Sequence, residues 1–432
     1  MAITTATALH TLTATEIVAA VNRGEATCEA VARACLEHTA AREREVQAWA
    51  HLDAEGVIAQ ARALDRSGTR GPLVGVPFGV KDIIDTSDLP TEYGSPIYKG
   101  HRPMRDAACV ALSRKAGGVL MGKAVTTEFA NVFPGKTRNP LDPARTPGGS
   151  SSGSAAAVGA SMVPLAIGTQ TTGSTTRPAS FCGVFGYRPT WGDLRTSGVM
   201  EASASLDTLG ILARSVEDVA LYRDVLLGVE PKTVDEPTAP PRIGFCRTHV
   251  WPRIEPHTQK LLENAAQALA RAGAHVEDVE LPKEFEGLED VHRWISGFEM
   301  ARNLTWEFQN HWNEISEIFR NGRIKDGLAC TYEHYVAMRN HMHHCRKLLL
   351  PFLERYDVLL AASAAGEATL GTHPIPHPWV YMIWTTMHVP SITIPVFTGP
   401  NRLPIGAQLI ARHHDDRRLF GFARWAHRTL TR

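Results

Sequence analysis

The segment 147–190 constrains the fold of this chain most tightly, because it holds two clusters of serine, threonine and glycine. The first cluster, 148–154, is GGSSSGS, and the second, 168–174, is GTQTTGS. Glycine loses more conformational entropy on folding than other residues, so such clusters indicate that backbone N–H groups closely approach an anionic group. A helical stretch of small residues follows the first cluster and favours the same interpretation. The hydroxyls beside these donors predict a nucleophilic serine next to an oxyanion hole.

Two other interpretations of the clusters are weaker. A flexible linker would be polar throughout, whereas apolar residues are interleaved here. A phosphate-binding loop needs a lysine, and neither cluster contains one. The segment 117–124 (GGVLMGKA) has the glycine and lysine spacing of a nucleotide-binding loop, but Ala124 stands where a magnesium-binding serine or threonine is required. We therefore expect no nucleotide site in either place.

Charge and cysteine content exclude several classes of protein. Lys plus Arg and Asp plus Glu are both 45, so the net charge is zero and no basic field favours nucleic acid or an acidic membrane. The seven cysteines form no CxxC pair, which predicts reduced thiols and a cytoplasmic protein. The sequence shows no signal peptide and no run of 18 apolar residues, so neither export nor a membrane span is expected.

The segment 73–84 (LVGVPFGVKDII) predicts a buried strand that carries one lysine, Lys81. Strand alternation places Lys81 on a face with little side-chain bulk, which leaves room for partners. A charged lysine is costly to bury, so two hypotheses stay open: an ion pair with Asp82 or Asp85, or a neutral amine that acts as a base. Lowering a lysine pKa from about 10.4 to near 7 costs about 4–5 kcal/mol, which burial can supply.

The remaining segments predict one domain over residues 1–432. Its four parts are N-terminal helices (12–70), the core with both clusters (71–228), a peripheral α/β and helical region (229–350), and C-terminal strands with a closing helix (351–432). Aromatic residues are frequent over 288–350, which favours packing of long helices, with a substrate funnel as the alternative. His341, His344 and Cys345 share a helix face, but no carboxylate accompanies them, and we expect no metal.

The central motifs resemble those of the amidase signature family of serine hydrolases. The glycine–serine block, the G-T-Q-T-x-G-S turn, R-P-A-S at 177–180 and CGVFGYRPT at 182–190 follow one another in the order of that family. The resemblance extends over roughly residues 12–430 and is least characteristic over 230–350. It implies the α/β class: an α/β/α sandwich around a large mixed β-sheet, the amidase signature fold.

The same resemblance implies a catalytic triad in which Ser174 is the nucleophile, Ser150 the bridging serine in a cis peptide, and Lys81 the base. It also implies an oxyanion hole formed by the backbone N–H groups of Thr171, Thr172, Gly173 and Ser174. The chemistry is consistent with the residues themselves: a serine needs a base to become nucleophilic, and no histidine lies near either cluster in the sequence. No metal and no cofactor are expected.

Two positions depart from the usual pattern of the family. Thr172 stands where a glycine is usual, so it could narrow the acyl pocket or offer its hydroxyl to the substrate. Arg177 follows the nucleophile by three residues, a spacing similar to malonamidase-type members, in which this arginine binds a substrate carboxylate. The alternative is a structural arginine paired with a neighbouring loop, and both stay open.

We therefore predict an amidase that hydrolyses the C–N bond of small-molecule carboxylic amides. One alternative is an esterase or carbamate hydrolase with the same triad. Another is an amidotransferase A-type subunit that works in a complex. The expected partner is a small-molecule amide, with neither nucleic acid nor a membrane, and a homodimer is left open.

Overall fold

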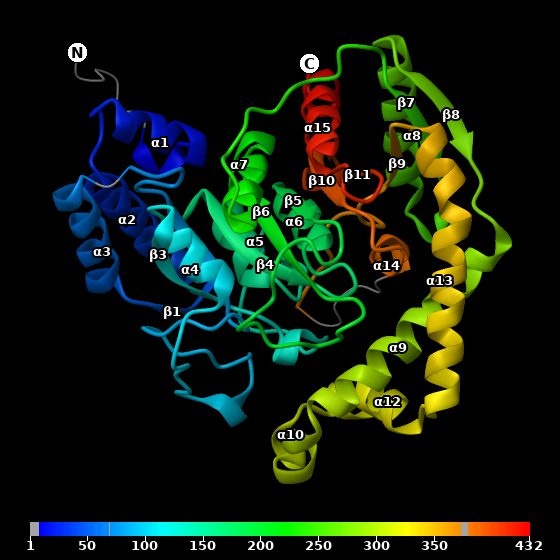
Figure 1. Cartoon of the computed structure of the whole chain (residues 1–432), viewed down its shortest axis with the longest axis horizontal. Coiled ribbons are helices and arrows are strands. Elements are labelled where there is room, and N and C mark those ends of the chain that lie inside the picture. The colour runs from blue at the N-terminus through cyan, green and yellow to red at the C-terminus, as the bar shows by residue number, and fades with distance from the viewer. Residues whose placement is uncertain (1–7, 69, 373–378) are drawn as a thin grey trace.

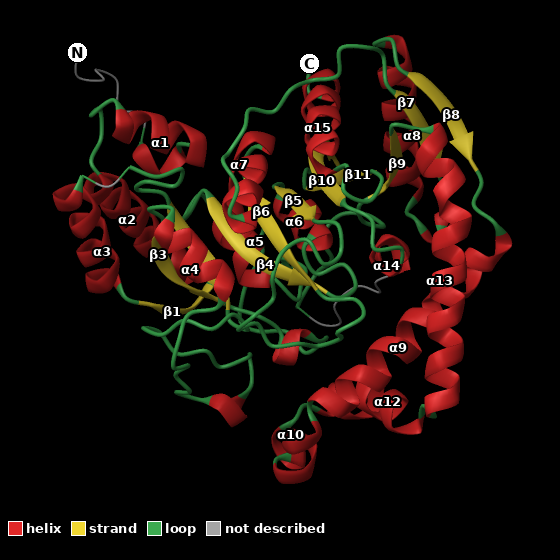
Figure 2. Ribbon diagram, in the orientation of Figure 1, coloured by secondary structure: helices red, strands yellow, loops and turns green. Residues whose placement is uncertain are grey.

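The computed structural model describes residues 8–68, 70–372 and 379–432. A large mixed sheet crosses the molecule, helices flank it, and a helical arm projects at one side (Figure 1). Figure 2 shows the same division: strands run across the molecule to β7 and β8 at the upper right, and the arm is built from helices and loops. The predicted fold class, an α/β/α sandwich around a large mixed sheet, is confirmed.

The sheet unites strands from the N-terminal third, the centre and the C-terminal third. Its eleven strands in the described residues follow the order β1 (Trp49–Leu52), β3 (Val119–Ala124), β2 (Pro77–Lys81), β4 (Leu165–Gln170), β6 (Thr208–Ala213), β5 (Phe185–Arg188), β10 (Ser391–Thr398), β11 (Pro404–Ile410), β9 (Val358–Ala362), β7 (Arg242–Cys246) and β8 (His275–Val279). The pairs β3–β2, β2–β4, β9–β7 and β7–β8 are parallel, and the other pairs are antiparallel. The strands at 242–279 thus extend the edge of the same sheet.

Helices cover the sheet on both sides. Those outside the arm are α1 (Ala14–Asn22), α2 (Cys28–Val46), α3 (Ala54–Ser67), α4 (Ala108–Lys115), α5 (Ser152–Gly159), α6 (Thr176–Cys182), α7 (Val216–Leu227), α8 (Pro256–Arg271), α14 (Trp379–Thr386) and α15 (Asp416–Leu430). Alternation along β5 separates the two layers. A Cβ atom on Gly186 would overlap Ala179 of α6, whereas the ring of the next residue, Tyr187, lies 4.9 Å from that of Phe420 in α15.

The arm comprises α9 (Leu288–Asn303), α10 (Thr305–Asn310), α11 (Glu317–Phe319), α12 (Lys325–Ala329) and α13 (Tyr332–Arg355). Its aromatic side chains divide between packing and surface. The ring of Phe298 stacks on that of Tyr335 at 4.1 Å, and Phe319 is fully buried. Trp306, by contrast, is 53% exposed. The packing interpretation therefore explains part of this aromatic content.

Two segments show how local sequence patterns set the bounds of a helix and of a strand. A capping box begins α1: the Thr13 hydroxyl accepts from Glu16 N, and the Glu16 carboxylate accepts from Thr13 N at 2.8 Å. The predicted strand over 73–84 is shorter: β2 comprises only Pro77–Lys81, which pairs with β3, and residues 78–80 also pair with β4. Two elements were not predicted from the sequence, β1 and α14, which are only four and eight residues long.

All seven cysteines are unpaired and buried. Burial raises the pKa of each thiol, for example to about 12 at Cys109 and Cys246. Within the described part of the chain, none of the helices has both the length and the apolar character that a bilayer crossing would need.

Candidate active site

Lys81 ends β2 and is completely buried. Phe78, on the opposite face of the strand, packs against Tyr222 of α7 with ring centroids 6.2 Å apart. The Lys81 amine instead donates to two hydroxyls, Ser150 Oγ at 2.7 Å and Thr169 Oγ1 at 2.8 Å. The structure therefore brings together Lys81 and Ser150, which lie far apart in the sequence and which the resemblance had linked.

The surroundings of Lys81 favour its neutral form. Burial lowers the pKa of Lys81 to about 7, and the negative charge of Asp207 opposes this shift. Within the described residues Lys81 forms no ion pair, so the ion-pair hypothesis for this lysine is not supported. Asp82 pairs instead with Lys123 at 3.1 Å, and Asp85 accepts from the Tyr93 hydroxyl at 3.3 Å.

One residue of the first serine cluster, Ser150, contacts Lys81. Ser150 follows a cis peptide bond from Gly149 and is 2% exposed. Its neighbours bind backbone groups: Ser151 Oγ bonds to Thr169 of β4, Ser152 Oγ donates to Val125 O, and Ser154 Oγ donates to Ile167 O. These contacts anchor the start of α5 against the sheet and leave the Ser150 hydroxyl with Lys81.

The second cluster ends in a tight turn, residues 171–174, which we call the oxyanion turn. Its four backbone N–H groups donate no hydrogen bond to any residue in the described ranges. A Cβ atom on Gly173 would overlap the ring of Tyr381, which explains why glycine is required there. Ser174 is 7% exposed, and its carbonyl accepts from Ser151 N at 3.3 Å, which joins the two clusters.

Two side chains that the sequence analysis did not select hold the start of this turn. Asp207 accepts from Thr171 Oγ1 at 2.6 Å and from the N–H groups of Ala202 and Ser203, and burial raises its pKa to about 6. His292 of α9 has its Nε2 atom 3.0 Å from both Thr171 O and Thr172 Oγ1. The Thr172 hydroxyl, expected to narrow the acyl pocket or to meet the substrate, thus contacts the arm.

Arg177, the second departure from the usual pattern, is 5% exposed. Its guanidinium donates to the Gly149 carbonyl at 2.5 Å and lies 5.4 Å from the centre of the Tyr381 ring. This contact with the residue before Ser150 supports the loop-bracing alternative for Arg177.

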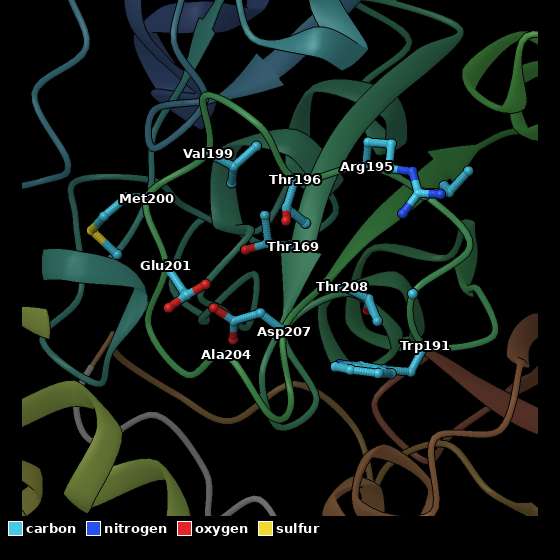
Figure 3. A pocket seen from close by; sticks show the side chains of 12 residues that line it. Thr169, Trp191, Arg195, Thr196, Val199, Met200, Glu201, Ala204, Asp207 and Thr208 are labelled. Carbon is cyan, nitrogen blue, oxygen red and sulfur yellow. The ribbon is translucent and has the colours of Figure 1, made fainter.

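Two cavities open near these groups. A cavity of about 130 Å³ is lined by Thr169, the Lys81 partner, and by Asp207, Glu201 and Trp191, among others; Figure 3 shows the Thr169 side chain beside that of Asp207. A second cavity of about 440 Å³ is lined by residues that include Tyr98, Phe129 and Leu304 of the arm. The residues of 288–350 that line this cavity, Asn303, Leu304 and Glu307, are not aromatic, so the funnel alternative for the aromatic side chains stays a hypothesis.

His341 and Cys345, which share a helix face with His344, contact a backbone carbonyl. His341 Nε2 bonds to the Glu284 carbonyl at 2.8 Å, and the thiol of Cys345 points to the same carbonyl. In the described ranges, three ligand-type side chains converge instead at His51, Asp82 and Glu92. The Lys123 ammonium already lies 3.1 Å from Asp82 there, so this cluster carries its own cation.

Comparisons with known proteins identify similar sequences and similar structures. A sequence model of the amidase family matches residues 30–420. The chain is 32% identical to the A-type subunit of the glutamyl-tRNA(Gln) amidotransferase of Chloroflexus aurantiacus, over 95% of each chain. It superposes on the native peptide amidase of Stenotrophomonas maltophilia with a TM-score of 0.85 at 27% identity, over 97% of each chain. Another solved amidase gives 0.88 at 27% identity, over 97% of this chain and 100% of that one. The predicted closeness to malonamidase-type members stays a prediction.

Proposed function

We propose, from the premise that this chain belongs to the amidase signature family, that it hydrolyses the C–N bond of small-molecule carboxylic amides through an acyl-enzyme on Ser174. The observation that carries the proposal is the contact of 2.7 Å between Lys81 Nζ and Ser150 Oγ in a fully buried site. A buried amine surrounded by hydroxyls, with a pKa of about 7, can serve as a base near neutral pH.

The proposed reaction begins when neutral Lys81 takes a proton from Ser150, which takes one from Ser174. The Ser174 oxygen then attacks the amide carbonyl, and the N–H groups of Thr171, Thr172, Gly173 and Ser174 stabilise the oxyanion. The same relay returns the proton to the leaving nitrogen as the C–N bond breaks. Water, deprotonated by the relay, finally cleaves the ester bond to Ser174 and restores the hydroxyl.

Replacement of the nucleophile tests this proposal. Ser174→Ala should abolish turnover and labelling by a fluorophosphonate, while circular dichroism shows an intact fold. Wild-type turnover should survive EDTA, because no step requires a metal ion. Full labelling of Ser174→Ala on another serine would refute the assignment.

A second candidate is an amidotransferase A-type subunit, which the likeness to that subunit of the Chloroflexus aurantiacus enzyme favours. Such a subunit would deliver ammonia within a complex. Turnover of simple amides by the purified chain alone would favour the first candidate, and turnover only with partner subunits present would favour the second. A parallel screen of aryl amides, aliphatic amides, esters and carbamates would separate the amidase from an esterase or carbamate hydrolase.

Arg177 is proposed either to bind a substrate carboxylate or to brace the loop that carries Ser150. A homodimer can be tested by light scattering of the purified chain. A cytoplasmic location can be tested by fractionation of cells that express it.

A further inference from the structure

Each carbonyl along the oxyanion turn has a donor of its own. Thr171 O accepts from His292 Nε2 at 3.0 Å, Thr172 O from Thr385 Oγ1 at 2.7 Å, and Gly173 O from Arg177 N at 3.0 Å. In a trans peptide the carbonyl and the following N–H lie in one plane and point in opposite directions. A donor that fixes one carbonyl therefore also directs the N–H group of the next residue.

The three donors thus orient three successive N–H groups, those of Thr172, Gly173 and Ser174. One donor, Arg177 N, belongs to α6 and follows from the local helix. The other two come from distant elements: His292 lies in α9 of the arm, and Thr385 lies in α14. Both side chains are almost completely buried, at 1% and 0% exposure.

The protonation of His292 follows from its partners. A carbonyl oxygen only accepts, so the Nε2 atom that faces Thr171 O carries the proton. Burial and the nearby positive charge of Arg323 lower the pKa of His292 to about 3, which keeps the ring neutral. The lone pair of that ring lies on Nδ1, so the Thr172 hydroxyl does not donate to His292 Nε2.

The same helix holds the turn by a second route. Glu299, two turns after His292 in α9, accepts from Ser205 N at 3.1 Å and from the hydroxyls of Ser203 and Ser205. The loop that carries these serines continues to Asp207, which accepts from Thr171 Oγ1 at 2.6 Å. The arm therefore contacts both the turn and the loop that supports it.

We infer that His292 and Thr385 are positioning residues of the oxyanion turn, which direct the N–H groups of Thr172 and Gly173 toward the developing oxyanion. This inference rests on the proposed acyl-enzyme function. It assigns a role to α9, in the part of the chain where family motifs are least characteristic, and makes the geometry of the turn depend on packing of the arm.

Pairs of variants that differ in one donor test the inference. His292→Leu and Thr385→Val remove the donor and keep most of the volume, whereas His292→Gln and Thr385→Ser keep an N–H or O–H donor. His341→Leu, on the same arm, is the matched control. Rates are normalised to the fraction of Ser174 that a fluorophosphonate titrates, so partial unfolding does not contribute.

We expect His292→Leu and Thr385→Val to lower kcat about 10- to 100-fold with KM changed less than about threefold, because misdirected donors act mainly in the transition state. Inhibition by a trifluoromethyl ketone substrate analogue, whose adduct places an oxyanion in the turn, should weaken in parallel. His292→Gln and Thr385→Ser should recover most of both losses. His341→Leu should match the wild type.

An unchanged kcat in both donor-less variants, or a rise in KM alone, would overturn the inference while leaving the proposed function intact. If the screen contains no amide that the chain hydrolyses, the rate at which a fluorophosphonate labels Ser174 allows the same comparison between the variants. A wild-type chain that neither turns over an amide nor is labelled on Ser174 would overturn the proposed function and this inference together.

Discussion

Two buried lysines on adjacent parallel strands have different surroundings. Lys81 ends β2 and contacts the hydroxyls of Ser150 and Thr169, whereas Lys123 of β3 pairs with the Asp82 carboxylate at 3.1 Å. The register places Lys123 beside Val80, whose side chain leaves the strand on the face opposite to that of Lys81. Both amines are completely buried.

The difference shows that burial alone does not create a base. Burial lowers the pKa of both lysines, but the carboxylate of Asp82 opposes the shift at Lys123 by favouring its charged form. At Lys81 the hydroxyl partners are neutral, and the more distant charge of Asp207 opposes the shift only in part. A lysine that lacks a bound carboxylate can release and accept a proton, and the paired lysine remains a structural cation.

The largest expected effect is a difference in activity between variants of the two lysines. Lys81→Met should lower kcat/KM on an amide by at least about a thousandfold, because the general base is lost. Lys123→Met, assayed on the folded fraction, should retain activity within about tenfold of the wild type. Steady-state kinetics with active-site titration measure both. Comparable losses in the two variants would abolish the distinction between a basic and a structural lysine.

The substitutions Lys123→Met and Lys81→Met should change the free energy of unfolding in opposite directions. Lys123→Met leaves the buried Asp82 carboxylate unpaired, which should cost about 3–5 kcal/mol of unfolding free energy. Lys81→Met removes the cost of keeping a buried amine neutral, which is about 4 kcal/mol at pH 7. It also loses two hydrogen bonds, which are worth about 1 kcal/mol each. We therefore expect the unfolding free energy of Lys81→Met to rise by about 2 kcal/mol.

The gain in stability expected for Lys81→Met depends on pH. The pKa of Lys81 is depressed in the folded chain, so between about pH 7 and 10.5 the unfolded state binds the extra proton and wild-type stability rises with pH. The advantage of Lys81→Met should therefore shrink across this window. Urea titrations at several pH values measure it, and the double variant Asp82→Asn/Lys123→Met, which leaves no unpaired charge, is the control for Lys123→Met.

Arg177 extends the comparison to a third buried cation, whose guanidinium donates to the Gly149 carbonyl. We expect Arg177→Ala to lower kcat/KM about tenfold on carboxylate-bearing and neutral amides alike, because the Gly149 carbonyl loses a charged donor next to Ser150. Arg177→Lys is the conservative control. A selective loss of roughly ten- to a hundredfold on carboxylate-bearing amides alone would instead establish the carboxylate role.

The smallest expected effect is a shift in the pH profile. The kcat/KM of the wild type should fall as pH decreases through about 7, because Lys81 becomes protonated and can no longer act as the base. Asp207→Asn removes a negative charge that favours protonated Lys81, so the midpoint of this acid limb should move to lower pH. A midpoint that stays in place would show that another group controls the limb.

Most of the candidate site could be predicted from the sequence because its motifs are local. Burial of Lys81 was predicted from an apolar run, and Ser150 and Ser174 lie in clusters rich in glycine and serine. The resemblance then linked residues that no periodicity could connect. Asp82 shows the limit of this reasoning: adjacency in sequence suggested Lys81 as its partner, whereas the strand register brings it to Lys123.

His292, Thr385 and Asp207 could not be selected in the same way. Each acts through packing between segments far apart in the chain, and a single histidine in a helical stretch rich in histidine and aromatics carries no distinguishing signal. Only its hydrogen bond to Thr171 reveals what Asp207 does. Short elements such as β1 and α14 escaped because their length is below that of a recognisable period.

The seven buried thiols have a practical consequence for spectroscopy. Because their pKa values are raised and their sulfurs are shielded, maleimide reagents near neutral pH should leave the folded chain unmodified. A cysteine introduced at the exposed Asn310, at the end of α10, would then be the single reactive position. A spin label or fluorophore attached there would report on the environment of the arm while the native cysteines stay in place.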